Sequence, residues 1–229
     1  MASDDLLSDN FESHFVLFKP KDIVSGDFYW ASEHESKFYL AVCDSTGHGV
    51  PGAFMSLLNI GFLSEGIKEK NIPETKEVFN YVRNRLVDSI SKEGQKDGFD
   101  GILFCIDRKT GLLTYSAAHN NPALVSQGQL INLPCDKMPV GKGEKNDSFA
   151  TNTIKLTRND TLYLYTDGYA DQFGGPKGKK FKYKQLEELL LSISNLPLKE
   201  QAGILNAKFE EWKGALEQVD DVLIIGIKV

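Results

Sequence analysis

The chain has 229 residues, of which 41% are hydrophobic and 25% charged, a composition typical of a soluble globular protein. Its formal net charge of −6 argues against a broad nucleic-acid-binding surface, which would need a stripe of basic residues. The three cysteines, Cys43, Cys105 and Cys135, are far apart and form no CxxC pair. We therefore expect free thiols, no zinc site and a reducing, cytoplasmic location.

The N-terminal segment, residues 1–12, is rich in acidic and polar residues and lacks the basic region of a signal peptide. We expect it to be a flexible lead-in to a single domain formed by residues 13–229. No apolar run reaches the length of a membrane span, so we expect no membrane-spanning segment in this chain.

Three short apolar segments predict the first strands, at residues 14–18, 23–31 and 37–43. The second and third form a natural antiparallel hairpin around a polar turn. If the turn is centred between Glu35 and Ser36, facing positions sum to 71, and Asp27 faces Asp44. Facing residues point to the same side of a sheet, with Cβ atoms about 5 Å apart. The hairpin therefore predicts two neighbouring carboxylates.

A glycine-rich stretch at residues 44–52 follows this hairpin. Gly47 and Gly49 allow a positive φ or a close approach of the backbone to a ligand. Asp44 supplies a hard oxygen of the kind that Mg²⁺ and Mn²⁺ prefer. Apolar residues at helical spacing then predict a helix at 50–70 and a second one at 73–94.

The remaining chain alternates short apolar runs with turn signals and then becomes helical. Strands are expected at 102–106, 112–117, 123–125, 130–133, 151–156, 161–166 and 219–229. Helices are expected at 183–194 and 197–216, and loops at 94–101 and 168–182. Many short strands at close spacing predict an α+β fold with antiparallel, meander-rich sheets.

Several acidic residues stand at the ends of these strands, beside glycine or loop sequence: Asp27, Asp44, Asp167, Asp220 and Asp221. Some end their strands and others begin theirs, so an antiparallel arrangement would bring them to one rim. Carboxylates gathered without matching basic residues need compensation, which divalent cations supply. Two ions about 3.5–4 Å apart are a standard device for phosphoester hydrolysis.

Four ordered motifs carry a family resemblance: SGDFYW at 25–30, CDSTGHG at 43–49, YTDG at 165–168 and DDV at 220–222. They resemble motifs of the PPM-type (phosphatase 2C-like) serine/threonine phosphatases, in the bacterial branch of stage II sporulation protein E. The resemblance runs from about residue 13 to the C-terminus. It implies an antiparallel β-sandwich of two sheets flanked by helical layers, with two Mn²⁺ or Mg²⁺ ions at one rim.

The resemblance also implies roles for single residues. Asp44 would bridge the two ions and hold the attacking hydroxide, so that no protein side chain acts as nucleophile. The implied metal ligands are Asp27, Asp44, the carbonyl of Ser45, Asp167 and Asp220. Asp221 and Asp100 are candidates to lie just behind these ligands. Family members with an upstream arginine use it for phosphate, and Lys19 or Lys21 are the available substitutes here.

The implied activity is hydrolysis of phosphoserine or phosphothreonine in a bacterial signalling protein, with an anti-sigma-factor antagonist as the type of substrate. An upstream sensor domain or regulator is a candidate partner. The alternative is a catalytically inactive or partner-gated regulatory binding module, and a weaker option is a small-molecule phosphohydrolase.

Three other features have ordinary interpretations. His48 and His119 are turn histidines, which more often pack or hydrogen-bond than bind metal, so neither belongs to the predicted ligand set. The lysine run at 177–180 is interpreted as a solvated loop. Its alternative interpretation is a docking site for an acidic phosphoprotein.

Overall fold

Two antiparallel sheets form the centre of the computed structural model, which describes residues 4–89, 97–157 and 159–228. One sheet has the order β2-β3-β4-β5-β9, with β8 paired to β4. Its strands are β2 (Asp27–His34), β3 (Lys37–Ser45), β4 (Gly98–Asp107), β5 (Leu112–Ala118), β8 (Val140–Gly141) and β9 (Asn152–Ile154). The other sheet has the order β1-β13-β10-β6-β7. Its strands are β1 (Ser13–Lys19), β6 (Ala123–Ser126), β7 (Gln129–Asn132), β10 (Thr161–Tyr165) and β13 (Val222–Lys228).

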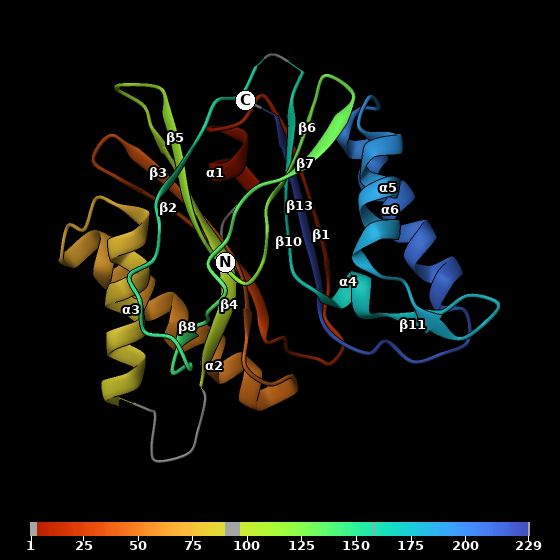
Figure 1. The fold of residues 1–229 in the computed structure, drawn as a ribbon, viewed down its shortest axis with the longest axis horizontal. Coiled ribbons are helices and arrows are strands. Elements are labelled where there is room, and N and C mark those ends of the chain that lie inside the picture. Colours follow the sequence, from red (N-terminus) through yellow and green to blue (C-terminus); the bar gives the residue numbers. More distant parts are fainter. Residues whose placement is uncertain (1–3, 90–96, 158, 229) are drawn as a thin grey trace.

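Helices cover the outer face of each sheet, which gives four layers (Figure 1). The β2–β5 side is covered by α2 (Gly49–Ser64), the π-helical turn η1 (Glu65–Glu69) and α3 (Thr75–Ser89). The β1–β13 side is covered by α5 (Tyr183–Ile193) and α6 (Leu198–Lys213). The predicted α+β sandwich with flanking helical layers is confirmed.

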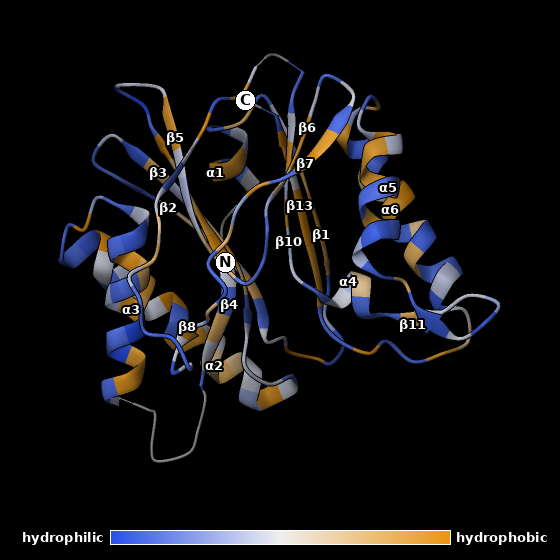
Figure 2. Ribbon diagram, viewed as in Figure 1, coloured by the Kyte–Doolittle hydropathy of each residue, from blue (hydrophilic) through white to orange (hydrophobic). Residues whose placement is uncertain are grey.

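Strand alternation divides the hydrophobic residues among three cores, and Figure 2 shows hydrophobic residues along the central strands. Phe38, Leu40 and Val42 of β3 face the opposite sheet, where Leu223 of β13 packs in the same core. Tyr39, Ala41 and Cys43 point the other way, toward α2 and α3. Because β3 is buried on both faces, its sequence is a continuous apolar run.

The N-terminal segment differs from the flexible lead-in that was expected. Residues Asp4–Ser8 form helix α1, and Leu7 and Phe11 are buried in the core between the sheets. The Phe11 ring packs edge-on against Phe38, with ring centroids 5.4 Å apart. Spaced apolar side chains therefore hold the described part of this segment on the domain.

The expected loop at 168–182 also contains regular structure: helix α4 (Gly168–Asp171) and the hairpin β11 (Phe173–Gly174) and β12 (Lys179–Lys180). The predicted strand at 23–31 begins only at Asp27 as β2. The terminal strand begins at Val222, so Asp220 and Asp221 precede it. Part of the second predicted helix and of the loop at 94–101 lies outside the described residues.

Helix α2 has an unusual distribution of polarity. Its buried side includes Ser56 and Asn59, whereas Val50, Phe54 and Leu57 are more than 60% exposed. The continuous helix Gly49–Glu69 has the length and mean hydropathy of a membrane span, and 33% of its apolar window is buried. Helices that cover the core of a soluble domain also meet these criteria, so this finding is weak evidence for a span.

Candidate functional site

Three aspartates lie side by side across the β2-β3-β4 sheet. Asp27 pairs with Asp44, and Asp44 pairs with Asp100 on the next strand. The hairpin register predicted from the sequence is therefore confirmed. Asp100 lies in β4 rather than in a loop, because this strand begins at Gly98. Alternation places Asp44 on the same face as Val42, so the carboxylates continue the inner face of the sheet to its rim.

The opposite sheet contributes its acidic residues at the same rim. Asp167 directly follows β10, and Asp220 directly precedes Asp221 and the start of β13. These two strands are antiparallel neighbours, which brings the end of one beside the start of the other. Asp44 experiences the negative charges of both Asp167 and Asp220, so the acids of the two sheets meet as predicted.

A hydroxyl joins the two sheets behind this rim. Thr166 Oγ1 donates a hydrogen bond of 2.6 Å to Asp27 Oδ2 and accepts one of 3.1 Å from the Leu223 backbone N–H. Asp27 is only 4% exposed. The threonine therefore fixes one carboxylate oxygen of Asp27 and links it to β13.

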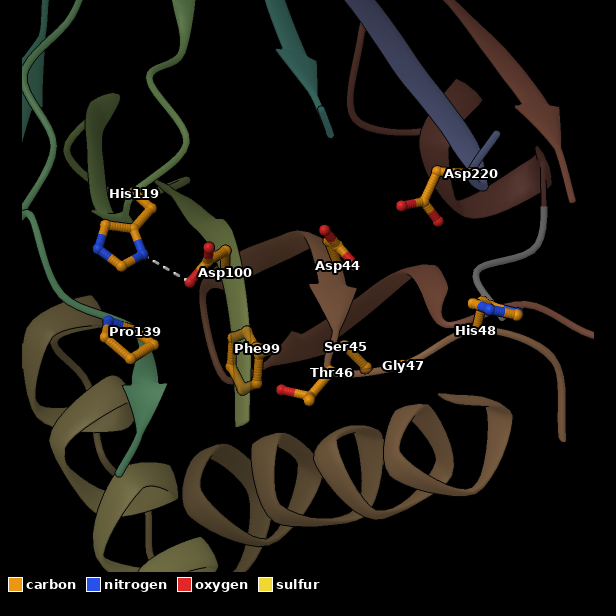
Figure 3. Close-up of a pocket in the computed structure, with 10 residues that line it drawn as sticks. All are labelled: Asp44, Ser45, Thr46, Gly47, His48, Phe99, Asp100, His119, Pro139 and Asp220. Atoms are coloured by element: carbon orange, nitrogen blue, oxygen red, sulfur yellow. Dashed lines mark hydrogen bonds and ion pairs between the residues drawn. The ribbon is translucent and has the colours of Figure 1, made fainter. Parts of the chain in front are cut away.

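Asp221 has a different task from Asp220. Its two carboxylate oxygens accept hydrogen bonds from the backbone N–H groups of Lys21, at 2.7 Å, and Gly26, at 2.8 Å. It is 3% exposed, whereas the carboxylate of Asp220 faces the pocket (Figure 3). Asp221 thus holds the segment that leads into Asp27.

Close contacts with the Gly47 backbone require glycine at positions 26 and 52. A Cβ on Gly26 would lie 2.3 Å from the carbonyl oxygen of Gly47, and a Cβ on Gly52 would lie 2.2 Å from the same atom. Gly47 itself has a φ of +88°. Three chain segments can therefore meet directly behind Asp44 only because these positions lack side chains.

Side chains of helix α2 hydrogen-bond to Ser45, the residue that follows Asp44. Asn59 Nδ2 donates a hydrogen bond of 3.0 Å to Ser45 Oγ, and the hydroxyls of Ser45 and Ser56 lie 3.1 Å apart. Ser56 Oγ also donates to the carbonyl of Gly26, at 2.6 Å. The buried polar residues of α2 thus connect this helix to the strand end that carries Asp44.

Burial and mutual repulsion raise the pKa of several of these carboxyl groups. Burial is the main cause in each case, followed by neighbouring negative charge. The pKa of Asp44 rises to about 8, and the charge of Asp167 is the largest cause after burial. The pKa of Asp167 rises to about 6, and the charge of Asp220 is the largest cause after burial. The pKa of Asp27 lies well above its ordinary value, through burial and the charge of Asp44. The cluster cannot be fully ionised near neutral pH without added positive charge.

A pocket of about 340 Å³ opens over this rim (Figure 3). Its lining residues are Asp44, Ser45, Thr46, Gly47, His48, Phe99, Asp100, His119, Pro139 and Asp220. His119 Nδ1 lies 2.8 Å from Asp100 Oδ1, as drawn in Figure 3. The sequence interpretation left His119 outside the predicted ligand set, as a residue that packs or hydrogen-bonds, and did not place it in the pocket wall. No local sequence pattern indicates this position of His119, because its contact with Asp100 depends on the pairing of β4 with β5.

His48 also lines the pocket, and its Nδ1 lies 3.3 Å from Asp22 Oδ2. Its side chain is 60% exposed. Lys19, one substitute considered for a phosphate-binding arginine, is ion-paired with Glu210 at 2.9 Å and is therefore engaged by α6.

The donor chemistry of the rim fits divalent cations, since it offers hard carboxylate oxygens that repel one another. Over the described ranges, no group of three or more His, Cys, Asp or Glu side chains is spaced to hold one metal ion. Asp44, Asp100 and Asp220 nevertheless line one pocket. The charge of Asp167 raises the pKa of Asp44, and the charges of Asp44 and Asp167 both raise the pKa of Asp27. The residues present fit a metal centre in chemistry, and the predicted ligand set stays a prediction.

Replacing Thr166 tests the link between the sheets. In Thr166→Val, the buried N–H of Leu223 and the carboxyl of Asp27 lose their partner, so we expect the free energy of unfolding to fall by about 1–3 kcal/mol. Thr166→Ser keeps the hydroxyl and should lose less than about 1 kcal/mol. Urea unfolding measures both, and equal losses in the two variants would contradict this role of the hydroxyl.

Comparison with known proteins identifies relatives. A model of the stage II sporulation protein E (SpoIIE) family matches residues 34–229, and no curated protein matches the sequence. The SiaA PP2C domain of Pseudomonas aeruginosa is 28% identical, with a TM-score of 0.88 over 99% of this chain and 90% of that one.

Two longer structures share the fold at lower identity. The phosphatase domain of Bacillus subtilis SpoIIE, solved with a fragment of its regulatory domain, is 18% identical, with a TM-score of 0.77 over 95% of this chain and 63% of that one. The structure of the RsbU and RsbW domains of a Mycobacterium tuberculosis protein is 19% identical, with a TM-score of 0.75 over 94% of this chain and 59% of that one. This chain spans less than two thirds of either.

Proposed function

Because the chain belongs to the stage II sporulation protein E family and has the fold of PP2C-type phosphatase domains, we propose that it is a metal-dependent serine/threonine phosphoprotein phosphatase. The observation that supports this most strongly is the row of Asp27, Asp44 and Asp100 at the rim where Asp167 and Asp220 also meet. Acids so placed suit a reaction that needs bound cations, and the pocket above them is open to a phosphorylated side chain.

We propose that Asp27, Asp44, the carbonyl of Ser45, Asp167 and Asp220 hold two Mn²⁺ or Mg²⁺ ions. A protein of similar fold, RsbX, has been solved in complex with magnesium, at 18% identity and a TM-score of 0.58. Bound ions of this kind neutralise the carboxylates, polarise a phosphoryl group and lower the pKa of water.

The protein's own residues position this chemistry. Thr166 orients Asp27 through its hydrogen bond to Oδ2, and Asp221 holds the segment before Asp27 through two backbone N–H groups. Asn59 and Ser56 hold Ser45 from α2. These fixed neighbours keep the acidic side chains near one another despite their repulsion, which is the organisation that a binding site needs before its ligand arrives.

The substrate we propose is a phosphoserine or phosphothreonine protein in bacterial signalling, of the anti-sigma-factor-antagonist type. The similarity to a structure that contains RsbU and RsbW domains supports a regulatory setting. An upstream regulator is a further candidate partner, supported by the B. subtilis structure that includes a fragment of its regulatory domain.

An aryl phosphate assay with added Mn²⁺ tests the activity. We expect hydrolysis that depends on Mn²⁺, stops when a chelator is added and returns when the metal is restored. Turnover at an unchanged rate in excess chelator would contradict the metal-dependent function. A purified preparation of Asp44→Asn serves as the control for contaminating phosphatases.

A partner-gated regulatory module is the second candidate. It is favoured by the exposed apolar face of α2, at Val50, Phe54, Leu57 and Leu58, on the helix that also holds Ser45. Titration calorimetry separates the two candidates. Mn²⁺ binding together with turnover supports the enzyme acting alone, whereas binding without turnover supports gating.

A further inference from the structure

A second pocket joins the acidic one along the wall formed by His119 and Pro139, which line both (Figure 3). It has a volume of about 290 Å³. Its lining is mainly basic, with Lys137, Lys142 and Lys145 and a single acidic residue, Glu144. We call these three lysines the lysine patch. A chain with a net charge of −6 thus places three cations directly beside its most acidic rim.

The ammonium groups of the patch are available for an external partner. Lys137 Nζ donates to Asn121 Oδ1 at 3.4 Å and to Cys135 Sγ at 3.1 Å, neither of which is a carboxylate. Among the residues that the structure describes, no carboxylate lies within ion-pair distance of Lys142 or Lys145. Glu144 is the single acidic residue among the described residues that line this pocket, so the three lysines leave its lining with a net positive charge.

The three arginines that the structure describes are already engaged within the fold. Arg83 donates to the carbonyl of Asp147 and stacks over Phe149, with 4.1 Å from guanidinium to ring centroid. Arg85 pairs with Glu65 at 3.1 Å. Arg108 pairs with Glu33 on the far part of the same sheet. Each described arginine is thus committed to the fold, which leaves lysines to supply positive charge at the pocket.

The loop that carries the patch is firmly anchored. Val140 and Gly141 form β8 and pair with Phe99 and Gly98 of β4, directly beside Asp100. The approach is so close that a Cβ on Gly141 would lie 2.4 Å from the carbonyl oxygen of Asp97. Met138 is buried in the core beneath α3. The backbone that Lys142 directly follows is therefore anchored to the strand that carries Asp100.

We propose that the lysine patch binds acidic side chains that flank the phosphorylated residue of the protein substrate. This inference rests on the proposed function, because it assigns the substrate preference of the same site. A phosphorylated residue over the rim places its flanking chain along the pocket wall, and the wall leads to Lys142 and Lys145. Ammonium groups suit this task because they pair with carboxylates without requiring one fixed geometry.

The lysine run at 177–180 offers a matched comparison. It lies in the β11–β12 region beneath α5 and α6, whereas β8 lies on the other side of the molecule (Figure 1). Lys177 and Lys179 are exposed, and Lys180 is paired with Asp171 at 2.8 Å. Removing two charges there changes the net charge as much as removing two from the patch. The double variants to compare are Lys142→Gln/Lys145→Gln and Lys177→Gln/Lys179→Gln.

The test uses two phosphoserine peptides that differ only in aspartate or asparagine residues around the phosphoserine. We expect the parent protein with Mn²⁺ to prefer the acidic peptide about tenfold in kcat/KM. In Lys142→Gln/Lys145→Gln, KM for the acidic peptide should rise about tenfold, while kcat and aryl phosphate kinetics stay within about twofold. The preference should weaken with added salt. Lys177→Gln/Lys179→Gln should behave as the parent.

Fluorescently labelled versions with alanine in place of phosphoserine measure binding without hydrolysis, by anisotropy. Tighter binding of the acidic version, lost only in the patch variant, supports the patch even if the parent shows no phosphatase activity. In that case the proposed function fails and the patch stands. If the parent hydrolyses aryl phosphate but binds and hydrolyses both peptides equally, the function stands and the patch is refuted. An equal loss of preference for the acidic peptide in both double variants also refutes the lysine patch as its binding site.

Discussion

Asp44→Asn is expected to lower the Mn²⁺-dependent phosphatase activity by about 10³-fold or more while the fold is retained. Asp44 is at the centre of the acidic row, with Asp27 on one side and Asp100 on the other. Asparagine has the same shape but offers a neutral amide, which is a weaker partner for a divalent cation. Initial rates with an aryl phosphate measure the effect, and circular dichroism checks the fold. Activity within tenfold of the parent would contradict the role of Asp44.

The same variant should be more stable than the parent when metal is removed. Folding raises the pKa of Asp44 to about 8, so its contribution to stability is complete below its ordinary pKa and is lost as pH rises through about 8. The asparagine side chain of the variant does not titrate. Each pKa unit corresponds to about 1.4 kcal/mol, so in chelator near pH 9 we expect Asp44→Asn to exceed the parent by on the order of 2–5 kcal/mol.

Urea unfolding in chelator at about pH 5 and about pH 9 measures this difference. We expect the advantage of the variant to be small at the lower pH and to grow toward the higher one. Saturating Mn²⁺ should reduce the stability advantage of Asp44→Asn at high pH, because the cation stabilises the parent, which binds it, more than the variant. An advantage that is independent of pH would show that the carboxyl of Asp44 is not under repulsion.

Gly168→Ala is expected to have the second large effect. Gly168 follows Asp167 at the start of α4, and a Cβ there would lie 1.9 Å from the carbonyl oxygen of Asp221. That atom belongs to the backbone, so the clash is relieved only by separating the two segments that carry Asp167 and Asp220. We expect the free energy of unfolding to fall by about 2–4 kcal/mol, together with loss of activity.

Gly203→Ala is the matched control for this substitution. Gly203 lies within α6, and a Cβ there would meet nothing within 4 Å. Alanine is the better helix former, so we expect a gain of about 0.5–1 kcal/mol and unchanged activity. Urea unfolding measures the free energy of unfolding of both variants. A decrease for Gly168→Ala no larger than about 0.5 kcal/mol would refute the close-contact argument.

Local patterns in the sequence were sufficient for the parts of the site that depend on short-range geometry. The pairing of Asp27 with Asp44 follows from hairpin symmetry, since a tight turn determines the register on both sides. The strands and most helices follow from apolar periodicity. The resemblance in four motifs indicated the two-sheet sandwich, which the family match and the solved structures bear out.

Features that depend on long-range packing could not be predicted in this way. Asp100 reaches the rim because β4 pairs with β3, and no local pattern states which strand follows β3 in the sheet. His119 reaches the pocket through the pairing of β4 with β5. Residues 4–12 look like a polar terminus, yet Leu7 and Phe11 find a place in the core between the sheets.

The most direct test of the central claim is a crystal structure of the chain grown with Mn²⁺, with anomalous diffraction measured at the manganese absorption edge. The account predicts two anomalous peaks at the rim of the sandwich, both contacting Asp44, with Asp27, Asp167 and Asp220 among the other ligands. Absence of any peak at Asp44 in crystals soaked with saturating Mn²⁺, from a preparation that hydrolyses aryl phosphate, would contradict it.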